Sequence, residues 1–95
     1  MFIVLLRLSD NKSAAAQFVA AHNQWIQRGF EDGVFLLAGS LQPSLGGCIV
    51  AHNTTGPELS VRVSSDPFVA QNVVKAEILE LSPNRVEASL GFLLP

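Results

Sequence analysis

The sequence has few charged residues and no cluster of basic ones. Charged side chains make up 15% of the 95 residues, and the formal net charge is −2. The basic residues are scattered along the chain, at Arg7, Lys12, Arg28, Arg62, Lys75 and Arg85. Because nucleic-acid binding requires a basic patch that neutralises phosphates, we expect no nucleic-acid partner.

The chain contains a single cysteine, Cys48, and His22, His52 and Cys48 do not have the spacing of a zinc motif. One cysteine excludes an internal disulfide bond and is consistent with a reducing cytoplasm. The glycine-rich stretch AGSLQPSLGG lacks the spacing of a dinucleotide-binding or phosphate-binding loop. We therefore expect no metal ion and no other cofactor.

Long hydrophobic runs are also missing. The apolar stretches MFIVLL and VFLLAGSL are far shorter than the roughly 20 residues that a membrane-spanning helix needs. The first residues carry neither the basic region nor the cleavage site of a signal peptide. These absences predict a cytoplasmic protein with no membrane-spanning segment.

What the sequence does contain is a high share of hydrophobic residues, 48%. Its length predicts one domain over residues 1–95, with a core at about 1–82 and an apolar tail at 83–95. A chain this short buries only roughly 60–65% of the surface that it exposes when unfolded. Since a small monomer needs polar cover, some of the apolar surface is expected to contact a partner.

Residue patterns predict that strands and helices alternate along the chain. The expected strands are residues 2–8, 34–41, 47–53 and 73–81, and the expected helical segments are 14–30, an amphipathic stretch at 57–63 and a short helix after Asp66. Ser13 is the expected cap of the first helix. This order predicts an α+β fold of the ferredoxin-like split βαβ type, in which an antiparallel sheet carries its helices on one face.

The strands expected at residues 2–8 and 34–41 are apolar on both faces. A sheet with one face in water should instead alternate between apolar and polar residues. Two-fold homodimers are the commonest assembly, so we expect a second copy of the chain to cover the helix-free face. The apolar ending SLGFLLP is expected to dock onto its own chain or onto that partner.

His22 and Asp66 are the candidate site residues that the sequence pattern suggests. His22 lies in the apolar stripe of the first helix, so it should face the sheet, where an unsatisfied imidazole would cost about 1–3 kcal/mol. Asp66 precedes Pro67, which suits a helix cap, and a loop could bring its carboxylate to His22. Such a pair either orients the imidazole for proton transfer or is a core histidine satisfied by a helix cap.

Four features occur in a fixed order along the chain: His22, LLAGSL at 36–41, GGCIV at 46–50 and DPFV at 66–69. This set, followed by AEILEL, resembles the YCII-related (YciI-like) family over nearly the whole chain to about Leu81. The resemblance implies a ferredoxin-like domain that assembles as a dimeric α+β barrel. It also implies that His22 and Asp66 form a catalytic pair, and it connects the chain with relatives that remove chloride from chlorinated aromatic compounds.

The same resemblance implies that Gly39 and Ser40 line a pocket. Gly39 would let a ligand approach the backbone closely, or it is a packing glycine of the strand. Ser40 stands where relatives commonly have proline, so its hydroxyl either binds a ligand or caps the strand end. Trp25 and Phe68 are the aromatic candidates for the pocket wall, with a core position as the alternative for Trp25.

Two functions remain open at the level of the sequence. The first is a small cofactor-independent lyase or isomerase in which His22 moves a proton on a small aromatic or unsaturated acid. Arg7 or Arg62 would then receive the carboxylate, unless both are solvated surface charges. The second is a module that binds a small ligand or a partner without catalysis, and in which the pair of His22 and Asp66 is structural.

Overall fold

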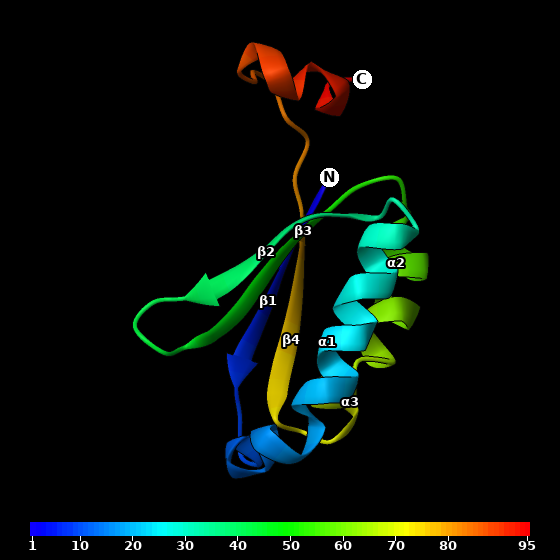
Figure 1. Cartoon of the computed structure of the whole chain (residues 1–95). Helices are drawn as coiled ribbons and strands as arrows, with labels where there is room; N and C mark the ends of the chain where they lie inside the picture. The colour runs from blue at the N-terminus through cyan, green and yellow to red at the C-terminus, as the bar shows by residue number, and fades with distance from the viewer.

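The computed structural model describes residues 1–95 and has the predicted α+β architecture (Figure 1). The elements are β1 (Phe2–Leu8), η1 (Lys12–Ala14), α1 (Ala15–Glu31), β2 (Phe35–Leu41), β3 (Gly46–Ala51), α2 (Gly56–Ser64), α3 (Pro67–Ala70), β4 (Val74–Glu80) and η2 (Ala88–Leu93). The strands form one four-stranded sheet in the order β2-β3-β1-β4, and every neighbouring pair is antiparallel. The helices α1, α2 and α3 lie on one face of the sheet (Figure 1). The predicted fold class is confirmed.

The central strand β1 fixes which side chains share a face of the sheet. Leu6 pairs with Gly47 on β3 and with Ala76 on β4, whereas its neighbour Leu5 pairs with Cys48 and Glu77. Residues that are opposite each other in an antiparallel ladder point to the same face. Leu6 therefore lies on the helix side of the sheet, and Leu5 lies on the helix-free side.

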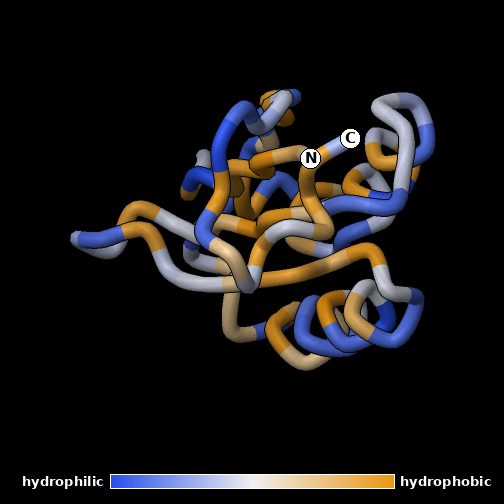
Figure 2. Tube along the Cα trace, turned by 90° about the horizontal axis from the view of Figure 1, so that it is seen from above, coloured by the Kyte–Doolittle hydropathy of each residue, from blue (hydrophilic) through white to orange (hydrophobic).

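The hydrophobic core lies between the sheet and the helices. It contains twelve buried residues. The most completely buried of them come from both layers: Val4, Ile49 and Ala51 from the sheet, Trp25 and Leu59 from the helices, and Val73 from the segment before β4. In Figure 2 the strands at the centre of the molecule are mostly hydrophobic, and the tips of the loops are mostly hydrophilic. The helices therefore pack on the core side of the sheet.

The start of the first helix differs from the prediction. The helix α1 has Ala14 as its N-terminal cap and no side-chain hydrogen bond there, so Ser13 does not cap it. The reason is that the 3-10 turn η1 runs directly into α1 and places Ser13 inside a helical turn. The helix α2, by contrast, begins with a complete capping box between Thr55 and Glu58.

The helix-free face of the sheet is apolar and has no cover from its own chain. Ile3, Leu5 and Val50 on this face are half-buried. Leu37, which pairs with Val50, is 59% exposed, and Leu79, which pairs with Ile3, is also exposed. The face therefore presents a hydrophobic surface to the outside.

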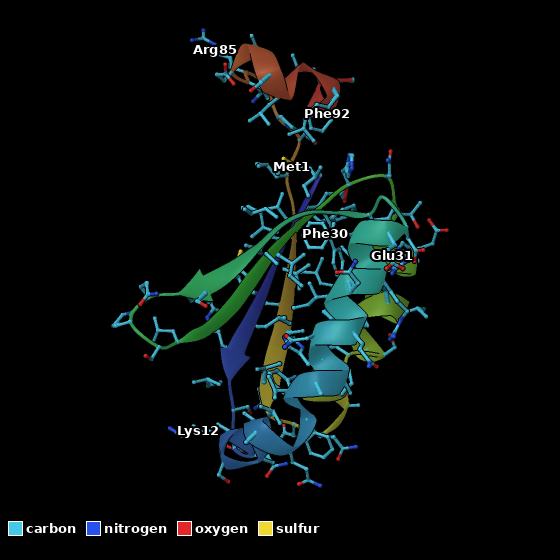
Figure 3. The ribbon with its side chains drawn as sticks, in the orientation of Figure 1. Met1, Lys12, Phe30, Glu31, Arg85 and Phe92 are labelled. Atoms are coloured by element: carbon cyan, nitrogen blue, oxygen red, sulfur yellow. The ribbon has the colours of Figure 1, made fainter.

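The C-terminal tail extends beyond one end of the sheet (Figure 1). Phe92 lies on the side of the tail nearest the sheet (Figure 3) and packs edge-on against His52, with 5.7 Å between the ring centroids. Phe92 is nevertheless 57% exposed, and Leu90 and Leu94 are exposed as well. The tail thus contacts its own chain through Phe92, while Leu90 and Leu94 remain exposed.

None of the helices combines the length and the apolar character that crossing a membrane requires.

Candidate active site

The candidate site is built around His22, which α1 carries on the side that faces the sheet. The imidazole is 12% exposed, so it is almost enclosed by the protein. Its stripe on α1 also contains Gly29, where an added Cβ would lie 2.1 Å from the Phe35 ring. The glycine therefore lets α1 pack closely on β2, and this contact holds the helix over the sheet.

Asp66 caps the short helix α3 and also binds the imidazole. Its Oδ1 accepts a hydrogen bond from the Phe68 amide at 3.0 Å and lies 2.7 Å from His22 Nδ1. The same oxygen makes both contacts, whereas the other oxygen, Oδ2, is buried and has no hydrogen-bond partner. Asp66 is fully buried, with 0% of its surface exposed. A single oxygen of Asp66 therefore provides both the helix cap and the contact with His22.

This contact determines which imidazole nitrogen is free. An ionised carboxylate can only accept hydrogen bonds, so Nδ1 of His22 carries the hydrogen that points at Asp66. In the neutral imidazole the other nitrogen, Nε2, then holds the lone pair. Nε2 is therefore the atom that can accept a proton from a bound molecule.

Two aromatic rings stack on the imidazole and restrain its orientation. Phe68 stacks on His22 with 4.0 Å between the ring centroids and 8° between the planes. Trp25 stacks on it more loosely, at 5.9 Å and 25°. The indole Nε1 of Trp25 donates to the carbonyl of Arg62 at 2.9 Å, which ties α1 to α2. The imidazole is thus restrained by stacking as well as by Asp66.

His22 lies in the wall of a cavity of about 600 Å³ between the helices and the sheet. The apolar part of the lining includes Leu6, Leu8, Ile26, Ala38, Ile49 and Val74. Its polar side chains, besides His22, are Asn23, Ser40, Gln42 and Ser44, all of them uncharged. No lysine, arginine, aspartate or glutamate belongs to the lining.

The structure brings most of the expected site residues to this cavity. Gly39, Ser40 and Phe68 line it together with His22. An added Cβ at Gly39 would have no atom within 4 Å, so strand packing does not require glycine there. Trp25 is buried against the imidazole and is not part of the lining. The aromatic wall of the cavity is therefore Phe68.

The two arginines considered for a substrate carboxylate lie elsewhere. Arg7 pairs with Glu77 at 2.5 Å on the helix-free face. Arg62 pairs with Asp32 at 2.8 Å and lies over the Phe35 ring. Neither residue lines the cavity, which corrects the expectation that one of them receives a carboxylate.

Three polar lining residues were not identified from the sequence. Asn23 follows His22 directly, but helical spacing places it beside the apolar stripe, so the sequence pattern assigns it to the outer side of the helix. Gln42 and Ser44 belong to the turn between β2 and β3, and their place in the lining depends on the path of that hairpin. The turn contains two backbone signals of a tight bend, Ser44 at φ 52° and Gly46 at φ 127°.

No group of three or more histidine, cysteine, aspartate or glutamate side chains is placed to hold a metal ion. The chemistry that the arrangement itself supports is proton transfer at Nε2 of His22 to or from a molecule in the cavity.

Neither a protein-family model nor a curated protein sequence matches the chain. Among solved structures, the chain is similar to 5-chloro-2-hydroxyhydroquinone dehydrochlorinase from Burkholderia phenoliruptrix, determined in complex with 2,5-dihydroxybenzoquinone. The TM-score is 0.69 at 13% sequence identity, over 86% of this chain and 94% of that chain. At this identity the similarity shows a common fold. The chain therefore shares its α+β fold with an enzyme that processes a small ring compound.

Proposed function

We propose that this protein is a small cofactor-independent lyase or isomerase of the YCII-related (YciI-like) type. Its base is His22, which moves a proton on a small ring compound held in the cavity. The observation that carries this proposal is the 2.7 Å contact between His22 Nδ1 and the buried Asp66 carboxylate, on a histidine that lines a cavity of about 600 Å³.

The proton transfer follows from the arrangement of the pair. Nε2 takes a proton from the bound molecule, and the imidazolium that forms is stabilised by the adjacent carboxylate of Asp66. An isomerase then returns the proton to another atom of the same molecule. A lyase instead lets the electron pair expel a leaving group such as chloride. Phe68 keeps the ring of His22 in one orientation during either reaction.

The solved relative supports the choice of a ring compound. Its printed activity is the removal of chloride from a chlorinated hydroxyhydroquinone, and its bound molecule is a benzoquinone. The apolar lining of the present cavity, with Phe68 on one side, suits the faces of such a ring. The uncharged polar side chains of the lining suit hydroxyl groups on the edge of such a ring.

We also propose that the protein is a homodimer and that the helix-free face is its interface. Exposed apolar side chains on that face, with Leu37 at 59% exposure, support this assembly. Large exposed apolar patches on small proteins commonly mark interaction sites. A dimer of this kind would form the α+β barrel that the family resemblance implies.

The test is turnover of hydroxylated and chlorinated ring compounds by the wild type and by His22→Asn. The variant keeps an amide donor for Asp66 but has no Nε2, so turnover should fall by at least roughly 100-fold while the fold is kept. His52→Asn is the matched control, because His52 packs on Phe92 and does not line the cavity. Full turnover by His22→Asn would contradict the proposal.

A second candidate function is a binding module without catalysis. One observation favours it: Cys48 pairs with Leu5 and faces the helix-free side, so His22 is the only acid or base in the lining that faces the cavity, and no second residue is placed to protonate a leaving group. Such a module would release its ligand unchanged. Nuclear magnetic resonance spectra of the ligand before and after incubation distinguish the two functions.

A further inference from the structure

The strand β4 forms an edge of the sheet, and its outer side has no partner strand. In the order β2-β3-β1-β4 it pairs only with β1. It is seven residues long and contains no proline that would interrupt pairing. The tail leaves the end of β4 and extends away from the sheet, so it does not cover this edge (Figure 1). An open edge of this kind can accept a further strand.

Hydrogen bonds at the two ends of β4 show which backbone groups point outward. Met1 and Leu81 exchange two hydrogen bonds, at 3.0 and 2.9 Å, and the Ser9 amide donates to the Val73 carbonyl at 2.9 Å. Hydrogen-bonded and non-hydrogen-bonded pairs alternate along an antiparallel ladder, so the odd-numbered residues of β4 direct their amides and carbonyls toward β1. The even-numbered residues present theirs at the open edge: Val74, Ala76 and Ile78.

The side chains of β4 are complementary to a second copy of the same strand. Lys75 and Glu77 are exposed on the helix-free face, one on each side of Ala76. When two copies of β4 lie antiparallel with Ala76 opposite Ala76, each Lys75 faces the Glu77 of the other copy. Each Val74 then faces the Ile78 of the other copy on the helix side. Opposite charges and apolar residues stabilise a strand pair in such positions, whereas a two-fold axis at Lys75 or at Glu77 would oppose like charges.

The helix side of the edge has room for another strand. A groove of about 600 Å³ runs between β4 and the helices α2 and α3. The strand contributes Val74, Ala76 and Ile78 to its lining, and α2 contributes the small side chains of Ser60 and Ser64. The outward amides and carbonyls of β4 are therefore not blocked by a large side chain of α2.

We infer that β4 pairs antiparallel with β4 of a second copy, on a two-fold axis through Ala76. The inference rests on the proposed homodimer for the identity of the partner, and it adds the strand and the register through which the copies meet. The contact is isologous, because the same residues are used by both copies. It also joins the two helix-free faces into one continuous apolar surface, since opposite residues of a ladder share a face. Edge pairing therefore adds to the proposed packing of that face.

Amide hydrogen exchange on the full chain tests the pairing directly. At millimolar concentration, the amides of Ala76 and Ile78 should exchange at least roughly tenfold more slowly than free amides, and this protection should fall on dilution. Without the contact these two amides point into water, whereas the amides of Lys75 and Glu77 remain protected by β1. Fast exchange at both Ala76 and Ile78 would overturn the inference.

Two charge variants test the register. Lys75→Glu and Glu77→Lys each place like charges opposite each other across the axis, so either change should raise the dissociation constant by at least roughly tenfold. An equal mixture of the two variants should instead form a heterodimer with about the wild-type dissociation constant, because every contact again joins opposite charges. Light scattering on each variant alone and on the mixture measures these effects.

Arg28→Glu on α1 is the matched control, since it changes the net charge as much as Lys75→Glu does but lies outside β4. It should leave the dissociation constant within roughly twofold of the wild-type value, and its mixture with Glu77→Lys should form no favoured heterodimer. Circular dichroism checks that every variant is folded. Folded Lys75→Glu and Glu77→Lys proteins that dimerise as the wild type does would overturn the inference, as would a mixture that associates no better than its components.

These results are separable from those that test the helix-free face. A wild-type dimer with fast exchange at Ala76 and Ile78 overturns the pairing of β4 and leaves the helix-free face as the interface. Protected amides, in a protein whose Leu5→Glu variant still dimerises, support the pairing of β4 and contradict the role of the face. A wild type that stays monomeric at millimolar concentration overturns both.

Discussion

The two faces of the sheet are both apolar, but only one is covered by the chain itself. Leu6 and Leu5 are neighbours on β1 and illustrate the difference. Leu6 is 3% exposed and joins the core and the cavity wall, whereas Leu5 is half-buried on a face without helices. The comparison teaches that one face contains the candidate site, and that the other presents an uncovered apolar surface.

The charged groups differ between the faces in the same way. On the helix-free face Arg7 and Glu77 form an ion pair whose side chains are 56% and 50% exposed. Such a pair contributes only about 0–1 kcal/mol because water solvates both charges. On the helix side the carboxylate of Asp66 is fully enclosed and depends on His22 and one amide. Chemistry is therefore expected on the helix side.

The largest expected effect is a difference in the free energy of unfolding between Leu6→Ala and Leu5→Ala. Leu6→Ala leaves a cavity in the packed core and should lower the free energy of unfolding by about 2–5 kcal/mol at every protein concentration. Leu5→Ala should cost less in dilute protein and more as the concentration rises, because the half-buried side chain would become fully buried only in the proposed dimer. Urea unfolding over a range of concentrations measures both. Equal losses at all concentrations would contradict the difference between the faces.

The next effect concerns the partner of the helix-free face. Leu5→Glu would place an unpaired carboxylate from each subunit in the proposed dimer interface, so the dissociation constant should rise by roughly 100-fold or more. Val19→Glu on α1 is the control, because Val19 is exposed and lies in a helix. Light scattering should give a dimer for the wild type and the control. A wild-type mass near the monomer value of 10.2 kDa at micromolar concentration would refute the interface.

The sequence predicts the elements well, because each is short and strongly patterned. The strands at residues 2–8 and 73–81 agree with β1 and β4 to within one residue at each end. The pairing of His22 with Asp66 could also be predicted from the sequence, because a histidine in an apolar stripe needs a hydrogen-bond partner. That argument does not give the geometry, however, because one carboxylate oxygen makes both contacts while the other makes none.

Other parts of the site depend on how separate elements meet. Trp25 and His22 are three residues apart on the same stripe, yet only His22 reaches the cavity. Gln42 and Ser44 join the lining from the turn after β2, and their place there depends on the path of the hairpin, which no local pattern predicts. The ion pairs of Arg7 and Arg62 join residues from distant parts of the sequence. Only the register of the sheet and the packing of the helices reveal those partners.

Asp66→Asn should have a smaller effect on stability and a large one on the site. The asparagine oxygen can still accept from the Phe68 amide, so the cap of α3 should remain. Its amide group would replace the buried Oδ2, which has no partner, and two unpaired hydrogens there should cost about 1–3 kcal/mol. The charge that supports an imidazolium would be lost. We expect folded protein by circular dichroism and a loss of at least roughly 10-fold in turnover of hydroxylated ring compounds, and unchanged turnover would contradict the role of Asp66.

The smallest effect should come from Thr55→Ala, which removes the other side-chain cap on the helix side of the sheet. Thr55 accepts from the Glu58 amide at 3.3 Å, and the Glu58 carboxylate accepts from the Thr55 amide at 3.1 Å. Both residues are exposed, so losing this cap should cost about 1 kcal/mol in urea unfolding. The contact between His22 and Asp66 should be unaffected, and turnover of ring compounds should stay at the wild-type level. If Thr55→Ala lost turnover as fully as Asp66→Asn, turnover would report the general stability of the helices, and Asp66 would act only as the cap of α3.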